Sequence, residues 1–429
     1  MARMVGDNGS AAAIVSKQLI PKMYKVRQKF DDCAVGNIDE EVQKILKRPG
    51  TLDKIKPGQS IAITAGSRGI ANLSKIIKAI IDEVKCKGGK PFVVPTMGSH
   101  GGASAEGQRE VIASFGITEE TMGCPVRSSM ETVQVGVSEY GLPVRIDKLA
   151  NEADGIIVVG RVKPHTSFRG KLESGLCKMI TIGLGKQYGA EICHAQGFRY
   201  MEKNITSIAA VVLQECKILF GVAIIENAYD KTKKLEAVPA EKIFDEEPIL
   251  LEEAKSSMPS IMFDEVDVLI IDKIGKDISG AGMDPNISGT FTTPYASGGL
   301  KKQRIVALDL TEESHGNGVG VGLADFIGRK LFDKLDFEKI YTNCLTSTVL
   351  TGGRVPLVMA NDKLAIQAGI KTCNCIDYDN PRIVRIKNTL KLGEIMISEA
   401  LLQEAENNPR MEVLEGLEGF TFNDQGNLF

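Results

Sequence analysis

Short apolar runs alternate with amphipathic segments along the first half of the chain, and this alternation limits the folds that the chain can adopt. The runs lie at residues 61–65, 91–95, 155–160 and 218–225 and have the length and composition of buried strands. Leucine, isoleucine and valine recur every three or four residues over 72–85, which is the spacing of one helix face. Strands separated by helices predict a mainly parallel sheet with helices on both faces, an α/β fold.

The length of 429 residues is too great for one ordinary hydrophobic core, so we expect two domains. A charged stretch punctuated by prolines, between Asp230 and Asp264, marks the boundary. We therefore predict an N-terminal domain over 1–260 and a C-terminal α/β domain over 261–429. Each is expected to be a mainly parallel or mixed sheet flanked by helices, and the second domain is expected to close a substrate cleft between them.

Further elements follow from the same patterns. Helices are expected at 104–115 and 202–217, a hairpin at 133–146, and no strand between 230 and 264. In the second half, strands are expected at 266–272, 304–310, 339–342 and 355–360, and helices at 320–334, 363–369 and 393–407. The last of these helices is expected to pack back on the N-terminal domain.

Composition excludes several classes of protein. The formal net charge of −3, the absence of tryptophan and an aromatic content of 5% give neither the charge nor the stacking surfaces that nucleic-acid binding needs. No apolar run reaches the roughly 18 residues of a membrane span, so no membrane partner is expected. The nine cysteines include no Cys-x-x-Cys pair, the usual pattern of a structural zinc site. We expect a cytoplasmic enzyme with reduced thiols.

The distribution of histidines predicts a site in the first half. The chain has four histidines, and three of them, His100, His165 and His194, fall between residues 100 and 194. His100 and His165 each follow a predicted buried strand closely, and loops at strand ends are where open α/β folds bind ligands. Imidazole is suited to proton transfer near neutral pH and to metal binding. These three side chains are therefore candidates for acid–base chemistry or metal ligation.

The residues alone leave several chemistries open. A zinc-dependent or other divalent-metal hydrolase or lyase would need two or three of these histidines as ligands, yet no pair has the His-x-x-x-His spacing. A non-catalytic protein that binds an anionic metabolite would need only the pocket. Lys178 lies in an apolar turn, where loss of hydration lowers the pKa of an amine and makes it a candidate nucleophile.

Several short motifs and one histidine occur in a characteristic order. They are Ser67-Arg68, Gly98-Ser99-His100-Gly101, Pro164-His165-Thr166, Ser174-Gly175-Leu176-Cys177-Lys178, and His194 sixteen residues after Lys178. Together they resemble the nickel-pincer-dependent lactate racemases and their relatives, which act on 2-hydroxy acids. The resemblance covers most of residues 20–225, whereas the second half matches only in its general organisation.

The resemblance implies that the domain over 1–260 is the catalytic and cofactor-binding one, and it implies a role for each residue. His100 and His165 would be the acid and base on opposite faces of the substrate, and His194 would be the protein ligand to nickel. Lys178 would anchor the pyridinium-derived mononucleotide, although the altered turn before it leaves ionic or hydrogen-bonded retention as an alternative to a covalent bond. Arg68 would lie near the substrate carboxylate, which a guanidinium can bind through two hydrogen bonds.

The implied reaction is racemisation or epimerisation of a 2-hydroxy acid. Hydride transfer from the substrate to the nickel-pincer nucleotide gives a 2-keto acid, which avoids the costly carbanion that direct deprotonation would form. The hydride then returns to the other face. The implied partners are the small hydroxy acid and the enzymes that make the cofactor.

Two segments of the second half also carry candidate functional residues. Lys276, in the glycine-rich loop after the predicted strand 266–272, could reach across the cleft to an anionic substrate. The segment 313–322 is similar to a dinucleotide-binding loop, but its spacing departs from Gly-x-Gly-x-x-Gly, so close helix–sheet packing is expected instead. His315, within it, has either a structural role or a place in the cleft.

Overall fold

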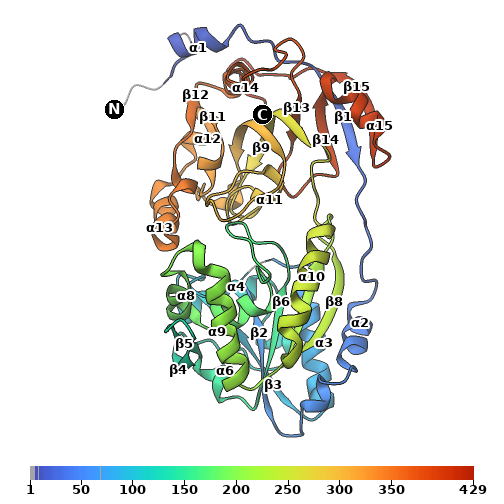
Figure 1. The fold of residues 1–429 in the computed structure, drawn as a ribbon, viewed down its shortest axis with the longest axis vertical. Coiled ribbons are helices and arrows are strands. Elements are labelled where there is room, and N and C mark those ends of the chain that lie inside the picture. Colours follow the sequence, from blue (N-terminus) through green and yellow to red (C-terminus); the bar gives the residue numbers. More distant parts are fainter. Residues whose placement is uncertain (1–4, 8, 68) are drawn as a thin grey trace. The chain divides into compact units, whose positions relative to one another are not determined.

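The computed structural model describes residues 5–7, 9–67 and 69–429, which form two compact units (Figure 1). One unit comprises Asp31–Met258, and the other joins Pro259–Phe429 to the N-terminal segment that ends at Phe30. The sequence-based division instead placed residues 1–260 in one domain. In the described part of the chain, no helix is both long and apolar enough to cross a membrane.

The Asp31–Met258 unit is built on a five-stranded sheet of order β3-β2-β6-β7-β8. Its strands are β2 (Ser60–Ala65), β3 (Lys90–Pro95), β6 (Gly155–Arg161), β7 (Ile218–Glu226) and β8 (Thr232–Pro239). The first four strands in the order are parallel, and β8 runs antiparallel to β7. The four buried strands expected from the apolar runs are confirmed, and so is the mainly parallel sheet.

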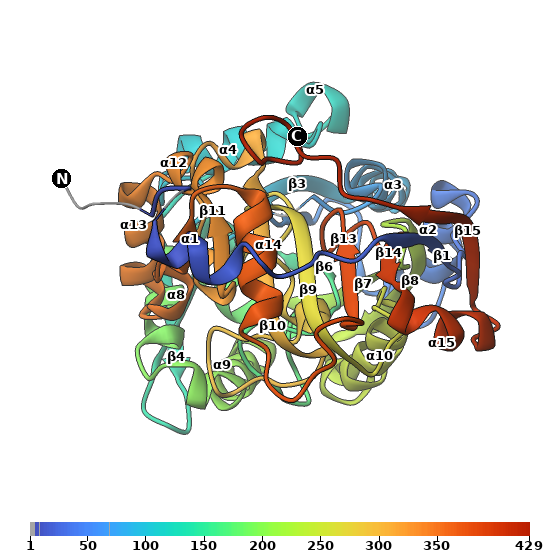
Figure 2. The ribbon, with the colours of Figure 1, turned by 90° about the horizontal axis from the view of Figure 1, so that it is seen from above.

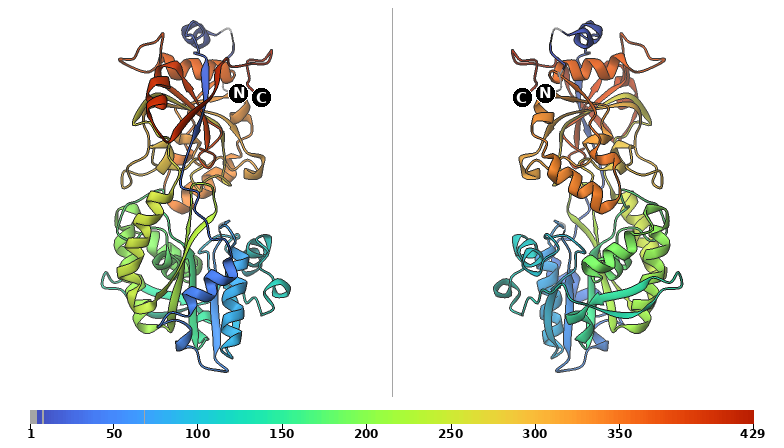
Figure 3. Two further views of the ribbon diagram at one scale, coloured as in Figure 1. Left: turned by 90° about the vertical axis from the view of Figure 1, so that its right-hand side faces the viewer. Right: turned by 90° about the vertical axis from the view of Figure 1, so that its left-hand side faces the viewer.

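Helices cover both faces of this sheet. In β2, Ala62 packs into one hydrophobic cluster while Ile61 and Ile63 pack into the other, as alternation along a strand requires. The helices of the unit include α2 (Ile38–Leu46), α3 (Leu73–Cys86), α4 (Ala105–Ser114), α9 (Met201–Glu215) and α10 (Ile243–Ser257). Figure 3 shows α2 and α3 on one side of the sheet and α9 and α10 on the other.

The strand β8 corrects the expectation that 230–264 contains none. The amide oxygen of Asn227 accepts hydrogen bonds from the backbone N–H groups of Tyr229 (3.0 Å) and Lys231 (3.1 Å), which forms a tight turn after β7. The following residues then pair with β7 as an edge strand. Their charged side chains, such as Lys234, which pairs with Glu253 at 2.8 Å, concealed the strand pattern in the sequence.

A short antiparallel hairpin completes this unit, as the sequence predicts. It consists of β4 (Thr132–Val137) and β5 (Pro143–Asp147), which pair in a separate two-stranded sheet. The buried end of β5 places Asp147 at the start of a short helix, α6 (Lys148–Glu152), where its carboxylate accepts from the N–H of Ala150 at 2.9 Å.

The other unit contains a mixed eight-stranded sheet of order β12-β11-β10-β9-β13-β14-β1-β15. Its strands are β1 (Met23–Gln28), β9 (Glu265–Ile274), β10 (Lys301–Leu310), β11 (Phe326–Gly328), β12 (Leu357–Met359), β13 (Ile383–Ile386), β14 (Glu394–Ser398) and β15 (Met411–Glu418). The run from β12 to β13 is parallel, and β14, β1 and β15 are antiparallel to their neighbours. Helix α14 (Asp362–Lys371) packs across β9 and β10 (Figure 2).

Three predictions for the second half were wrong. Residues 339–342, expected as a strand, lie within helix α13 (Phe337–Ser347), because the carboxylate of Asp336 accepts from the N–H of Lys339 at 3.3 Å and caps the helix start. Residues 320–334, expected as one helix, divide into a 3₁₀ turn, strand β11 and helix α12 (Arg329–Asp333). A strand of three residues is too short for its own periodicity to be visible.

The third error concerns residues 393–407, expected as one helix. Glu394–Ser398 forms strand β14, in which the alternate residues Ile395 and Ile397 are buried, and only Leu402–Asn407 forms an α-helix, α15. Both elements belong to the unit that contains Pro259–Phe429. The apolar spacing of the strand was read as a helix because the segment lacks a glycine or proline between its two parts.

Candidate functional site

Three loops meet at the carboxyl edge of the five-stranded sheet. Strands β2, β3 and β6 are parallel, so their carboxyl ends lie on the same edge. Ser67 follows β2, His100 follows β3 and His165 follows β6. The Oγ of Ser67 lies 2.5 Å from Nδ1 of His100, which joins two of these loops directly. This is the edge at which open α/β sheets bind their ligands.

The loop that carries His165 is held by a buried carboxylate. The backbone N–H of His165 donates to Oε2 of Glu173 at 2.6 Å, and the side chain of Arg169 donates to the carbonyl of His165 at 2.6 Å. The N–H of Ser167 donates to the ring Nδ1 of His165 at 3.0 Å. Because Nδ1 accepts this bond, the neutral imidazole carries its proton on Nε2.

A second element brings Lys178 and His194 to the same place. The helical turn α7 (Leu176–Lys178) continues through a π-helical turn at Met179–Gly183 into α8 (Lys186–His194). The positive charge of Lys178 lowers the pKa of both His165 and His194. The ring of Phe198 lies 6.0 Å from that of His165 and 5.7 Å from that of His194, between centroids. Three of the predicted residues are therefore neighbours.

The orientation of His194 leaves one ring nitrogen available. Its Nδ1 lies 2.6 Å from the carbonyl oxygen of Ala190, one helical turn earlier. A carbonyl oxygen only accepts, so Nδ1 carries the proton and the lone pair is on Nε2. Histidines that bind metals in proteins usually make this kind of hydrogen bond through the other nitrogen. The pKa of His194 is lowered below its usual value, mainly by burial, so the ring is neutral at neutral pH.

Burial and nearby positive charges both act on the ring of His165. Burial lowers its pKa well below the usual range, and the charge of Lys178 adds to that effect. The pKa of His165 is lowered further, by smaller amounts, by His194, Arg169 and Lys163. The imidazole is therefore neutral at neutral pH, and the surrounding cations make the place attractive to an anion.

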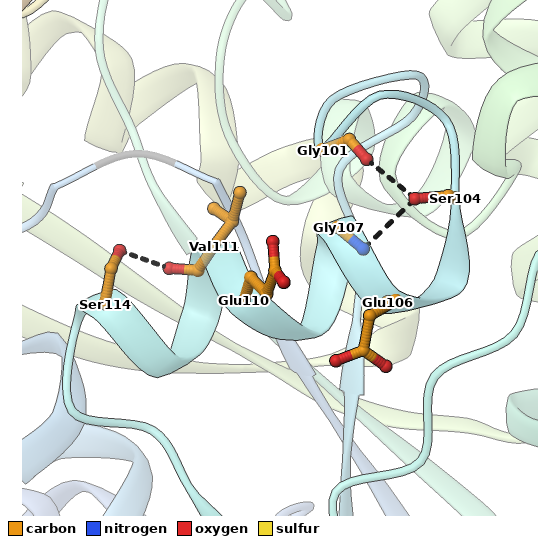
Figure 4. A pocket seen from close by; sticks show the side chains of 7 residues that line it. All are labelled: Gly101, Ser104, Glu106, Gly107, Glu110, Val111 and Ser114. Carbon is orange, nitrogen blue, oxygen red and sulfur yellow. Dashed lines mark hydrogen bonds between the residues drawn. The ribbon is translucent and has the colours of Figure 1, made fainter.

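The loop that carries His100 is clamped to the start of α4. The Oγ of Ser104 donates to the carbonyl of Gly101 at 3.2 Å and accepts from the N–H of Gly107 at 3.1 Å (Figure 4). Gly101 has a φ of +68°, and a Cβ there would lie 2.6 Å from the nitrogen of Gln108. This close approach fixes the path of the chain directly after His100.

The other predicted site residues lie elsewhere or are not described. Arg68 lies outside the described residues. Lys276 follows β9 in the other unit, where its Nζ donates to the carbonyl of Gly280 and to the amide oxygen of Asn343, both at 3.0 Å. The described residues include no group of three His, Cys, Asp or Glu side chains that could hold a metal ion by themselves.

The glycine-rich segment after His315 packs closely against other loops, whereas close packing of a helix on the sheet was expected. A Cβ at Gly320 would lie 1.7 Å from the carbonyl oxygen of Ala281, and a Cβ at Gly322 would lie 2.1 Å from that of Thr351. His315 itself is exposed and adopts a left-handed conformation with φ of +47°. Its carbonyl accepts from Nζ of Lys339 at 2.8 Å.

Sequence reasoning missed the buried carboxylate of Glu247, which supports the turn that carries Lys178. Glu247 lies on α10, and its Oε2 accepts from the N–H of Cys177 at 2.9 Å. A Cβ at position 175 would lie 2.0 Å from its Oε1, so the turn needs Gly175. Burial raises the pKa of Glu247 to about 7. Because 70 residues separate Glu247 from Cys177, no local pattern could reveal the contact.

The raised pKa of Glu247 predicts a pH dependence of stability. The pKa of Glu247 is about 7 in the folded chain and 4.5 when the side chain is exposed, as in the unfolded chain. The folded state therefore binds this proton more tightly than the unfolded state. The free energy of unfolding is therefore unaffected by this group below pH 4.5 and falls as the pH rises from 4.5 to 7. Above pH 7 it is lower by roughly 3 kcal/mol. We expect Glu247→Gln, which mimics the protonated acid, to lose this decline.

Urea unfolding of both proteins at pH 5 and pH 8 measures the effect. The free energy of unfolding of the wild type should fall more between the two pH values than that of Glu247→Gln. The difference between the variants isolates this residue, because every other group titrates in both. Parallel curves would show that the carboxyl titrates normally.

The comparisons with known proteins concern the same part of the chain. A sequence model described as the lactate racemase N-terminal domain matches residues 10–204. This part of the chain belongs to the lactate racemase family. The match includes His100, His165, Lys178 and His194, and the family relation indicates an isomerase of the racemase or epimerase type.

The fold is also that of a solved lactate racemase. The chain is similar to the lactate racemase apoprotein from Thermoanaerobacterium thermosaccharolyticum, with 15% identity and a TM-score of 0.51. The likeness covers 86% of this chain and 99% of the other. At that identity the likeness shows the shared α/β architecture. No curated protein matches the sequence.

Proposed function

We propose that the chain is a racemase or epimerase of a 2-hydroxy acid that works with a nickel-pincer nucleotide. The observation that carries the proposal is the cluster of His165, Lys178 and His194, in which the two imidazoles differ in orientation. Nδ1 accepts a hydrogen bond in His165 and donates one in His194. The free side of the His165 ring thus presents an N–H donor, and that of the His194 ring presents a lone pair that could bind a metal.

The residues present fit the cofactor that the family relation implies. His194 offers one lone pair, on Nε2, and a metal already bound by a pincer ligand needs only such a single protein donor. The amine of Lys178 is close enough to act electrostatically on both histidines, where it would hold the nucleotide by a covalent bond or by charge. Lys163 and Arg169 add positive charge near His165, which suits a phosphate and carboxylates.

The remaining chemistry concerns protons held by the two histidines. When bound, the cofactor supplies a reversible acceptor for the hydride on C2 of the substrate. His100 would take the hydroxyl proton on one face, with its ring held by Ser67. On the other face, His165 would supply the proton from its protonated, imidazolium form and return to the neutral ring, and the roles of the two histidines reverse in the opposite direction.

The low pKa of His165 also fits an anionic substrate. Cations around the ring disfavour its protonated form before substrate binds. A carboxylate that enters this environment offsets those charges and returns the pKa toward the working pH, where proton transfer in both directions is efficient. Arg68 and Lys276 remain proposed contacts of that carboxylate.

A panel of enantiopure 2-hydroxy acids tests the proposal. The protein is produced together with the enzymes that make the cofactor, and each acid is followed by chiral chromatography. Lactate and acids with longer side chains are included, since the side chain of the substrate is open. At least one acid should lose its optical purity, whereas a nickel-loaded protein that leaves the whole panel unchanged would contradict the proposal.

Elemental analysis and intact mass of the same preparation separate the other functions. Nickel with an added nucleotide-like mass, or with a releasable small chromophore, supports the proposal. Zinc as the only metal would favour a hydrolase or lyase. Neither metal nor added mass, together with tight binding of an anionic metabolite, would favour a binding protein.

A further inference from the structure

Lys186 is a fully buried lysine that the proposed reaction does not use. It begins α8, has a φ of +54° and has no exposed surface. Its Nζ lies 3.1 Å from Oδ2 of Asp147, another fully buried group at the end of β5. Burying a charged pair removes the hydration of both groups, which disfavours folding unless other contacts replace it.

The ammonium group of Lys186 contacts the start of the loop that carries His100. The Nζ of Lys186 donates to the carbonyl oxygen of Pro95, the last residue of β3, at 2.5 Å. It also donates to Oε1 of Gln108 at 3.1 Å. Gln108 lies on α4, the helix that follows the loop, and its side chain is fully buried. One buried cation thus joins both ends of the loop.

Gln108 extends this contact to His100 itself. Its Nε2 donates to the carbonyl of Gly98 at 2.9 Å and to the carbonyl of His100 at 3.3 Å. Because Oε1 accepts from the ammonium group of Lys186, the amide can face the loop only with its NH₂ group. Lys186 therefore fixes which way the amide points, and the amide fixes the backbone on either side of Ser99.

The helical segment that carries Lys186 also supports the His100 loop by packing. A Cβ at Gly98 would lie 3.3 Å from Cγ2 of Ile182 and 3.4 Å from Cβ of Ala190, so the loop backbone rests against these side chains. The helical segment that carries Lys178 and His194 is therefore in contact with the loop of His100. His165, by contrast, is held by Glu173 and Ser167 and has no part in these contacts.

We propose that Lys186 is a positioning residue that holds His100 in place through Gln108. A lysine is suited to this task because it donates to Pro95 and Gln108 at once, while Asp147 balances its charge. An apolar side chain would leave the two acceptors buried without partners. The catalytic consequence rests on the proposed function, whereas the structural one does not.

Two variants separate positioning of His100 from stability of the fold. Lys186→Met combined with Asp147→Asn removes the donors without leaving a buried charge alone. Gln108→Glu keeps the contact with Lys186 but replaces the donors that face Gly98 and His100 by an acceptor. Lys217→Met serves as a matched control, since its Nζ donates to the carbonyl of Ala153 at 3.1 Å, in the same unit.

The first readout is the set of histidine ring resonances in protein labelled at the imidazoles, without cofactor. The chain has four histidines, so each resonance can be assigned by single substitution. Both variants should shift the His100 resonances and leave those of His165 and His194 in place, and Lys217→Met should shift none. Unchanged His100 resonances in the folded variants, or equal shifts of all four, would overturn the proposal.

The second readout is turnover of the cofactor-loaded protein. Both variants should lower kcat at least tenfold at unchanged nickel content, with little change in KM. Unchanged kcat would show that Lys186 supports only the fold. Shifted His100 resonances in a chain whose wild type shows no racemisation would retain the positioning role and reject the proposed function instead.

Discussion

Replacing either His100 or His165 by alanine is expected to abolish interconversion of the enantiomers while nickel remains bound. Each imidazole is proposed to handle the hydroxyl proton on its own face, and both are needed in one turnover. Loss of general acid–base catalysis lowers rates by roughly 10²–10⁴-fold for a single group. The nickel ligand proposed here, His194, is untouched in both variants. Chiral chromatography measures the rate, and elemental analysis measures the metal.

His315→Ala is the matched control for this pair. His315 is the fourth histidine of the chain, is exposed, and has no part in the proposed proton transfers, so its loss should leave the rate unchanged. Retained turnover in both His100→Ala and His165→Ala would rule out the mechanism with two bases. Loss of nickel in either variant would place that histidine among the metal ligands instead.

Replacing His194 by alanine is expected to remove the metal. The hydrogen bond from Nδ1 to the carbonyl of Ala190 leaves Nε2 as the donor, and alanine has none. The helix should persist, because α8 is held by its own backbone bonds and by packing of Cys193 in the core. Nickel should fall to background in a protein whose circular dichroism matches the wild type.

Lys178→Ala provides the contrast to His194→Ala. If the lysine anchors the nucleotide covalently, the intact mass of this variant should lack the added group, whereas that of His194→Ala should lack only the metal. Stoichiometric nickel in purified His194→Ala would contradict the assignment of the ligand.

Much of the Asp31–Met258 unit was predictable because each element carries its own local signal. The apolar runs at 61–65, 91–95 and 155–160 are too short for helices and became parallel strands. Loops at the ends of such strands meet at one edge, which is why the sequence predicts that His100 and His165 share a site.

The supporting contacts could not be predicted, because they join residues that are distant in the chain. Lys186 is 91 residues from Pro95 and 78 from Gln108, and Glu247 is 70 from Cys177. In the sequence, Lys186 and Glu247 both look like ordinary charged residues of the surface. Only the folded chain shows that they are buried.

The second half was harder to predict for a different reason. Its sheet includes β1, from the first 30 residues, and several strands of three to five residues. Strands this short have no visible period of their own, so the run 320–334 was read as a helix. Pairing with residues far away in the sequence decided their structure instead.

Racemisation of a 2-hydroxy acid deuterated at C2, carried out in ordinary water, tests the central claim most directly. If His100 and His165 move only the hydroxyl proton while the hydrogen on C2 leaves and returns as hydride, the inverted product keeps its deuterium. Chiral separation followed by mass spectrometry measures both quantities in one sample. Inverted product that has exchanged its deuterium for solvent hydrogen would contradict the account, because it would mean that a base removes the C2 hydrogen as a proton.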